Sequence, residues 1–174
     1  AFGSEKQMLE HFAAHLRKLD PDMIIGWALQ WADIKQIASR MKVCGLEPGI
    51  LSPYKKHRYE YMDWDQPIPG VACLDLKTGF DKLWVLKNGQ LASKKLDDVA
   101  WVALKERKLE LPDGHDTFYT DIGTYLDYNL RDVELMPRLD ALLNVSEHFI
   151  SLAHACQIRF RDTPHVTKLA LSLF

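Results

Sequence analysis

Three residues of the sequence have types and positions that suit hydrolytic chemistry: Asp33, Tyr128 and Asp132. Carboxylates can hold two divalent cations about 3.5–4 Å apart, and the cations then stabilise the attacking and leaving oxygens of a phosphodiester. A tyrosine beside such a site can orient the attacking water. The combination indicates a two-metal phosphodiesterase, and each residue by itself also has a plainer interpretation.

Asp33 comes a few residues after a short apolar run, residues 22–27, at the start of a predicted helix. Sites in α/β sheets form at the carboxyl ends of strands, which favours a functional carboxylate at this position. The plainer interpretation is a helix N-cap, in which the side chain of Asp33 accepts hydrogen bonds from free backbone N–H groups. On the residues alone, both interpretations remain open.

Tyr128 and Asp132 are four residues apart, so they share one face of the last predicted helix. This places a phenol next to a carboxylate, as hydrolytic chemistry requires. The plainer interpretation is the polar surface of an amphipathic helix, because pairs with this spacing are common there. The presence of Asp33 elsewhere in the chain, together with this pair, favours a hydrolytic site over a polar helix surface.

The elements that must position these residues follow from the apolar pattern. Two short apolar runs bounded by turn residues, 22–27 and 71–76, are typical of buried parallel strands. Helical spacing predicts four helices: residues 4–19, residues 33 to about 45, a helix beginning at Leu96, and residues 120 to about 155. We expect Pro137 to kink or divide the last helix. Strands separated by helices predict an α/β fold in one domain.

Composition limits the class of protein. The chain has 174 residues, of which 47% are hydrophobic, enough for a core. It has no apolar run of about 18 residues and no secretory leader, so we expect no membrane insertion and a cytoplasmic location. Three widely spaced cysteines fit neither a disulfide framework nor a zinc site. A net charge of −2 counts mildly against nucleic-acid binding, and less against an enzyme whose metal site is itself acidic.

Two segments, in order, carry a family resemblance. The first is Pro-Asp-Met-Ile-Ile-Gly-Trp, residues 21–27, leading to Asp33; the second is Tyr-Asn-Leu-Arg-Asp-Val, residues 128–133. Asp132 follows Asp33 by 99 residues, with Val71–Leu76 and Leu96–Ala100 between them. Together these segments resemble the second and third exonuclease motifs of family B DNA polymerases, whose 3′→5′ proofreading domains are DEDDy exonucleases.

The resemblance implies a ribonuclease H-like α/β exonuclease core that is partial here, with its initial antiparallel strands missing and helices flanking a short sheet. It assigns residues 1–157 to the exonuclease domain, residues 47–70 to a loop or protruding hairpin within it, and residues 158–174 to the start of the connection toward the polymerase palm. An exposed sheet edge would favour a homodimer. The other implied partners are DNA and the remainder of the polymerase chain.

The resemblance also implies a reaction and a site. The domain would remove nucleotides from the single-stranded 3′ end of a primer, using two Mg²⁺ or Mn²⁺ ions held by Asp33 and Asp132, while Tyr128 orients the attacking water. The residues implied to contact DNA are aromatic or basic: Trp27, Trp31, Lys55, Lys56 and Arg58. Aromatic side chains can stack on unpaired bases.

The chain departs from the family pattern in three places. The Asp-x-Glu motif of the first strand is absent, Ala28 stands where the family usually has asparagine, and Ala32 stands where it has phenylalanine or tyrosine. We therefore expect the chain alone to be inactive. Two alternatives stay open: a degenerate module that binds single-stranded DNA or braces the polymerase without catalysis, and a free-standing DEDDy nuclease. A bacterial or phage context is expected.

Overall fold

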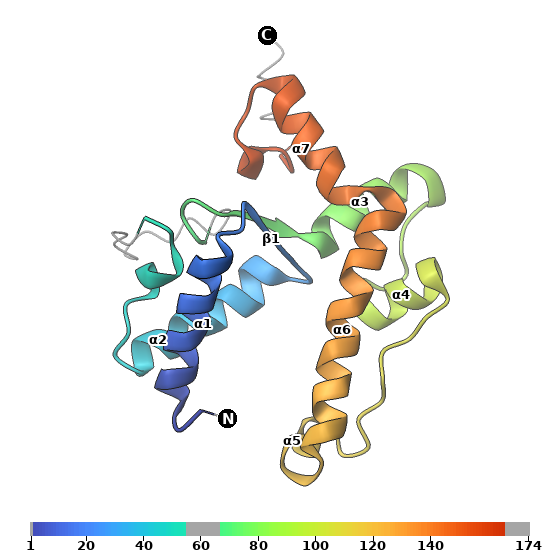
Figure 1. The fold of residues 1–174 in the computed structure, drawn as a ribbon. Coiled ribbons are helices and arrows are strands. Elements are labelled where there is room, and N and C mark those ends of the chain that lie inside the picture. Colours follow the sequence, from blue (N-terminus) through green and yellow to red (C-terminus); the bar gives the residue numbers. More distant parts are fainter. Residues whose placement is uncertain (1, 55–66, 166–174) are drawn as a thin grey trace. The chain divides into compact units, whose positions relative to one another are not determined.

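The chain forms two compact units in the computed structural model, which describes residues 2–54 and 67–165 except the side chains of Gln30 and Trp31 (Figure 1). The first unit comprises Ala1–Asp75 and Phe149–Phe174, and the second comprises Leu76–His148. Asp33 therefore belongs to the first unit, whereas Tyr128 and Asp132 belong to the second.

The first unit begins with helix α1, Glu5–Leu19, close to the predicted bounds. The side chain of Ser4 accepts a hydrogen bond from the Gln7 N–H at 3.2 Å, which satisfies one of the free amides of the first turn. The helix ends at Asp20, whose left-handed backbone (φ 44°) precedes Pro21. Its buried residues recur at helical spacing and face the core: Leu9, Ala13 and Leu16.

Strands β1, Met23–Gly26, and β2, Ala72–Asp75, form a parallel pair. Met23 is opposite Ala72 and Gly26 is opposite Asp75, so both strands end at the same edge of the sheet. The predicted α/β class and the two predicted strands are thus confirmed. The homodimer expected through a sheet edge stays a prediction, because the structure describes a single chain.

A π-helix, η1, spans Leu29–Asp33 and leads directly into helix α2, Ile34–Val43. A short 3-10 helix, η2, follows at Pro48–Leu51, inside the stretch predicted as a loop. Helix α1 packs against α2 and η2, and η1 packs against β2 and α2. The core of this unit is apolar: Leu9, Ala13, Leu16, Leu29, Ile34, Met41, Leu51, Ile68, Val71 and Cys73.

The second unit is helical. Its elements are α3 (Leu76–Asn88), α4 (Leu96–Leu104), the 3-10 turn η4 (Gly114–Asp116), α5 (Thr117–Thr120) and α6 (Ile122–Leu143). Helix α6 packs against α3, α4 and α5 (Figure 1). The sequence analysis did not predict α3, whose Gly79 weakens the helical signal. That glycine is buried beside Leu76 and Phe80, on the face that packs inward.

The last predicted helix is divided, but not at Pro137. Helix α6 continues through Pro137 to Leu143, and Asn144 then takes a left-handed conformation (φ 49°) with its N–H donating to the Asp140 carbonyl. Helix α7, Val145–Cys156, follows, and a 3-10 turn, η5, spans Phe160–Asp162. Pro137 therefore does not divide the helix; the break comes at Asn144 instead, because asparagine tolerates the left-handed conformation. A kink at Pro137 stays a prediction.

Among the described residues, no helix combines the length and the apolar character needed to cross a membrane. The cysteines are present as free thiols at Cys44, Cys73 and Cys156. Cys73 is buried in the first unit, where loss of solvent raises the pKa of its thiol to about 11.

Candidate functional site

Asp33 is the last residue of η1, and its side chain makes no capping hydrogen bond to α2. The N-cap interpretation was therefore wrong. Asp33 has helical backbone angles (φ −66°, ψ −55°), whereas a capping residue usually has extended ones. The π-helix runs straight into α2, and the first amide of α2 is already bonded to η1, since the Ile34 N–H donates to the Leu29 carbonyl. The carboxylate is left to face outward.

The surroundings of Asp33 disfavour its charged form. Nearby protein atoms remove part of its hydration and raise the pKa of this carboxyl, and the charge of Asp75 raises it further. Asp33 is nevertheless an exposed residue, whereas Asp75 is buried, with 8% of its surface accessible.

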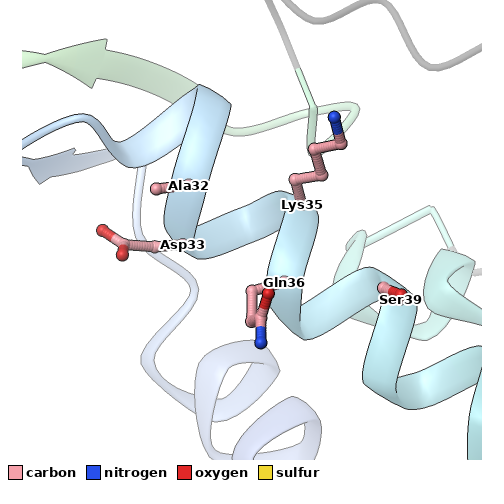
Figure 2. Close-up of a pocket in the computed structure, with 5 residues that line it drawn as sticks. All are labelled: Ala32, Asp33, Lys35, Gln36 and Ser39. Carbon is pink, nitrogen blue, oxygen red and sulfur yellow. The ribbon is translucent and has the colours of Figure 1, made fainter.

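A hollow of about 360 Å³ adjoins Asp33 and is lined by Ala32, Asp33, Lys35, Gln36 and Ser39. Figure 2 shows that the carboxylate of Asp33 points away from Lys35, and that Gln36 and Ser39 lie further along α2. These polar groups do not converge on one point. Asp33 is thus the chemically distinctive group of this surface, and the α2 residues do not complete a binding site around it.

The two candidate tryptophans lie on either side of the turn that follows β1. Trp27 directly follows the strand and is half-buried. Its side chain is thus neither fully enclosed in the core nor fully exposed for stacking on a base. Trp31 lies in η1, and its side chain is outside the described part. Ala28 between them is left-handed (φ 63°), and its N–H donates to Asp75 Oδ1 at 3.2 Å.

Tyr128 and Asp132 lie on one face of α6, as predicted, and a lysine joins them. Lys108 Nζ is 2.7 Å from Asp132 Oδ2 and donates a hydrogen bond to the Tyr128 hydroxyl at 2.6 Å. The same ammonium lies 4.6 Å from the centroid of the Tyr128 ring. The three side chains therefore form one cluster on this polar face of α6.

The electrostatics of this cluster are set by its partial burial. Burial alone would lower the pKa of Lys108, but its hydrogen bonds with Asp132 and Tyr128 and the charge of Asp132 raise it on balance. The other carboxylate oxygen, Asp132 Oδ1, is buried and has no hydrogen-bond partner within residues 2–54 and 67–165. A buried anionic oxygen without a donor is unfavourable, so this atom is a ready ligand for a cation.

The sequence analysis missed Lys108. It lies in the segment after α4, and its backbone N–H donates to Asp97 Oδ1 at 2.9 Å. Arg107 Nη1 reaches Asp97 Oδ2 at 2.6 Å and its guanidinium lies 4.8 Å from the Trp101 ring centroid. The sequence analysis recognised the Leu-Asp-Asp-Val-Ala segment, residues 96–100. Spacing alone could not show that Asp97 holds Lys108 beside α6.

Two further contacts tie the same segment to α6. Glu106 Oε2 accepts from Arg131 Nη2 at 2.5 Å and also binds Arg138. Residues 106–108 are therefore fixed to the helix that carries Tyr128 and Asp132. A hollow of about 330 Å³ opens beside them, lined by Asp97, Arg107, Lys108, Leu109, Glu110 and Tyr128.

The structure leaves the expected metal site and basic DNA contacts as predictions. No group of three or more acidic, histidine or cysteine side chains able to hold a metal ion occurs within residues 2–54 and 67–165. The basic residues implied to bind DNA, Lys55, Lys56 and Arg58, lie outside the described residues.

Comparison with known proteins identifies the family. A family model described as DNA polymerase family B, exonuclease domain, matches residues 1–93, more than half of the chain. The chain belongs to this family. The matched part contains Asp33 and both strands of the sheet, whereas Tyr128 and Asp132 lie beyond it. No curated protein matches the chain significantly.

Membership confirms the resemblance drawn from the two sequence motifs. It indicates exonuclease activity on DNA for the parent polymerase, and domains of this family generally use divalent metals. A parallel sheet with flanking helices fits such an exonuclease domain.

Proposed function

We propose that this chain is the part of a family B DNA polymerase that performs 3′→5′ proofreading, hydrolysing the last phosphodiester at the single-stranded primer end. Asp132 and Tyr128 act directly in that reaction, and Asp33 contributes the second acidic position. The observation that carries the proposal is the cluster on α6: Lys108 binds both Asp132 Oδ2 and the Tyr128 hydroxyl, and the buried Oδ1 of Asp132 has no hydrogen-bond partner among the described residues. We further propose that the complete domain has a ribonuclease H-like core.

The residues present fit a divalent cation in part. Asp132 Oδ1 supplies an oxygen without a donor among the described residues, and Asp33 supplies an outward-facing carboxylate. In the complete protein each of these carboxylates would supply a ligand to Mg²⁺ or Mn²⁺, and a bound metal would stabilise negative charge on the phosphodiester oxygens. Further ligands are needed, because Mg²⁺ prefers about six oxygens.

Tyr128 is suited to orient a water molecule. Its hydroxyl oxygen accepts the Lys108 hydrogen bond, so its own proton remains available for donation to a second oxygen. Lys108 also pairs with Asp132 Oδ2, so Oδ1 is the carboxylate oxygen that this lysine leaves open. The cluster thus combines a fixed hydroxyl donor with a carboxylate oxygen that lacks one.

The test is an exonuclease assay of the complete polymerase on a 5′-labelled single strand with Mg²⁺. We expect Asp132→Asn to lower the rate by at least about 10²-fold, the scale of losing one preorganised charge-stabilising group. Tyr128→Phe, which removes only the hydroxyl, should lower it by about tenfold or more.

Matched controls lie nearby in the second unit. Asp127→Asn and Tyr119→Phe change exposed residues outside the cluster, and should leave the rate unchanged. DNA synthesis by every variant reports correct folding. Retention of normal exonuclease activity by Asp132→Asn would refute the assignment, as would equal losses in Asp127→Asn.

The degenerate, non-catalytic module is the second candidate, and a specific observation favours it. Lys108 already pairs with Asp132, which lowers the need for a metal ion there. On this alternative, the complete polymerase would bind a fluorescent single strand without shortening it, and Asp132→Asn would leave that binding unchanged. The same labelled strand, run with and without Mn²⁺, separates the two candidates.

We also propose that the 174-residue chain alone is inactive, since the described residues offer no cluster of three metal ligands. Rapid Mn²⁺-dependent shortening of a labelled single strand by the purified chain would contradict this. The cytoplasmic location, the bacterial or phage context and the implied DNA contacts of Trp27 and Trp31 remain parts of the same proposal.

A further inference from the structure

The carboxyl edge of the sheet contains a buried acid that the proofreading proposal does not use. Asp75 ends β2, directly opposite Gly26 at the end of β1. Only 8% of its surface is accessible, and its Oδ1 accepts the Ala28 N–H at 3.2 Å. A buried carboxylate is costly unless it makes hydrogen bonds that matter to the fold or the site, so its contact with this turn is informative.

The turn that Asp75 holds is strained. Ala28 is left-handed (φ 63°, ψ 29°), a conformation that costs a residue with a Cβ roughly 1–2 kcal/mol. The turn is also tight, since a Cβ at Gly26 would lie 2.9 Å from Leu29 Cδ1 and 3.0 Å from Leu29 Cβ. Some interaction must hold the chain in this shape, and the bond to Asp75 fixes the residue that bears the strain.

Ala28 determines the direction of the element that ends on Asp33. Its carbonyl accepts the Ala32 N–H at 2.9 Å, and η1 begins at the next residue. The Asp33 side chain makes no capping bond of its own. The backbone of η1 therefore sets where the Asp33 carboxylate points, and that backbone starts from the turn bonded to Asp75.

We propose that Asp75 is a positioning residue for Asp33: its carboxylate holds the left-handed turn at Ala28 and so fixes the π-helix that carries Asp33. The functional half of this inference rests on the proposed exonuclease role of Asp33. Asp75 acts through the backbone as a hydrogen-bond acceptor, which the test can separate from its charge.

The test uses the complete polymerase and the single-strand exonuclease assay. Asp75→Ala removes the acceptor and should lower kcat by about tenfold or more with little change in KM, because small misplacements of a catalytic group are costly. Asp75→Asn keeps a carbonyl oxygen for Ala28 and should retain activity within about threefold. Ala28→Gly relieves the strain, so it should restore most of the activity lost in Asp75→Ala.

Asp162→Ala is the matched control, since Asp162 is another buried aspartate of the first unit and accepts instead from Arg159 at 2.9 Å. It should leave exonuclease kcat unchanged. Hydrogen exchange of the peptide containing Ala28 gives a readout besides activity, and Asp75→Ala should lose protection there, with Asp75→Asn keeping it.

The outcomes distinguish this inference from the proposed function. If Asp33→Ala retains full activity, the role of Asp33 is refuted, and exchange at Ala28 still decides whether Asp75 holds the turn. If Asp33→Ala is inactive, positioning by Asp75 is overturned by any of three results. These are normal kcat in Asp75→Ala, an Asp75→Asn variant as impaired as Asp75→Ala, and no restoration by Ala28→Gly.

Discussion

Replacing Lys108 with methionine is the most direct test of the cluster on α6. The substitution keeps an unbranched side chain but removes the ammonium that lies 2.7 Å from Asp132 Oδ2 and 2.6 Å from the Tyr128 hydroxyl. Asp132 Oδ1 has no hydrogen-bond partner among the described residues, and Lys108→Met removes the ammonium from Oδ2. The variant therefore has a largely buried carboxylate that has lost its ion pair. We expect the chain to lose stability.

The size of the loss follows from the burial of the pair. The side chains of Lys108 and Asp132 are 23% and 21% exposed, so the pair lies between a surface ion pair and a fully buried one. Surface pairs contribute up to about 1 kcal/mol, and breaking a buried pair costs about 3–5 kcal/mol. We therefore expect Lys108→Met to lower the free energy of unfolding by about 2 kcal/mol.

Urea unfolding of the chain, followed by circular dichroism at pH 7, measures this loss. Lys94→Met is the matched control in the same unit: Lys94 lies 2.6 Å from Asp81, but its side chain is 54% exposed, so the loss should stay below about 1 kcal/mol. Because the pKa of folded Lys108 is raised, its contribution is fully present below the unfolded pKa of about 10.4 and is lost as the pH rises through the folded pKa. Lys108→Met should remove that alkaline loss.

A double variant makes the reasoning refutable. Lys108→Met with Asp132→Asn removes both charges, and should recover part of the stability lost in Lys108→Met because no uncompensated carboxylate remains. A loss in Lys108→Met no larger than in Lys94→Met would refute the proposed cost of burial. So would a double variant less stable than Lys108→Met alone.

Three further predictions concern other parts of the chain. Ala28→Gly should raise the free energy of unfolding by about 0.5 kcal/mol, because glycine relieves the left-handed strain. Ala14→Gly, in the exposed middle of α1, should lower it by about 1 kcal/mol. Urea titrations that give the same sign for both variants would contradict this. The hydrogen bond from the Thr124 side chain lowers the pKa of Asp121, so its contribution is present above the unfolded pKa of about 3.9 and is lost as the pH falls through the folded pKa. Asp121→Asn should therefore lower the melting temperature at pH 7 and have less effect near pH 2.5. Cys73, with a thiol pKa of about 11, should react with a disulfide reagent at pH 8 only on unfolding; prompt reaction of all three cysteines in the native chain would contradict its burial.

The sequence by itself determined the local elements and the family. Helical spacing with a Ser4 cap set α1, short apolar runs between turn residues set both strands, and the order of two weak motifs identified a polymerase exonuclease. These features depend on neighbours in the chain, which a sequence displays directly. The helix break was expected at Pro137, whereas α6 continues through that residue and ends before Asn144.

Only the tertiary structure decided what surrounds the acidic residues. The bond from Ala28 to Asp75 spans 47 positions, and the contact of Lys108 with Asp132 depends on how the segment after α4 is held against α6. No spacing rule predicts such contacts, because they arise from the packing of separate elements. The same holds for Asp33: its residue type favoured a helix cap, but it ends a π-helix that is continuous with α2, its side chain makes no capping bond, and the carboxylate is left for other chemistry.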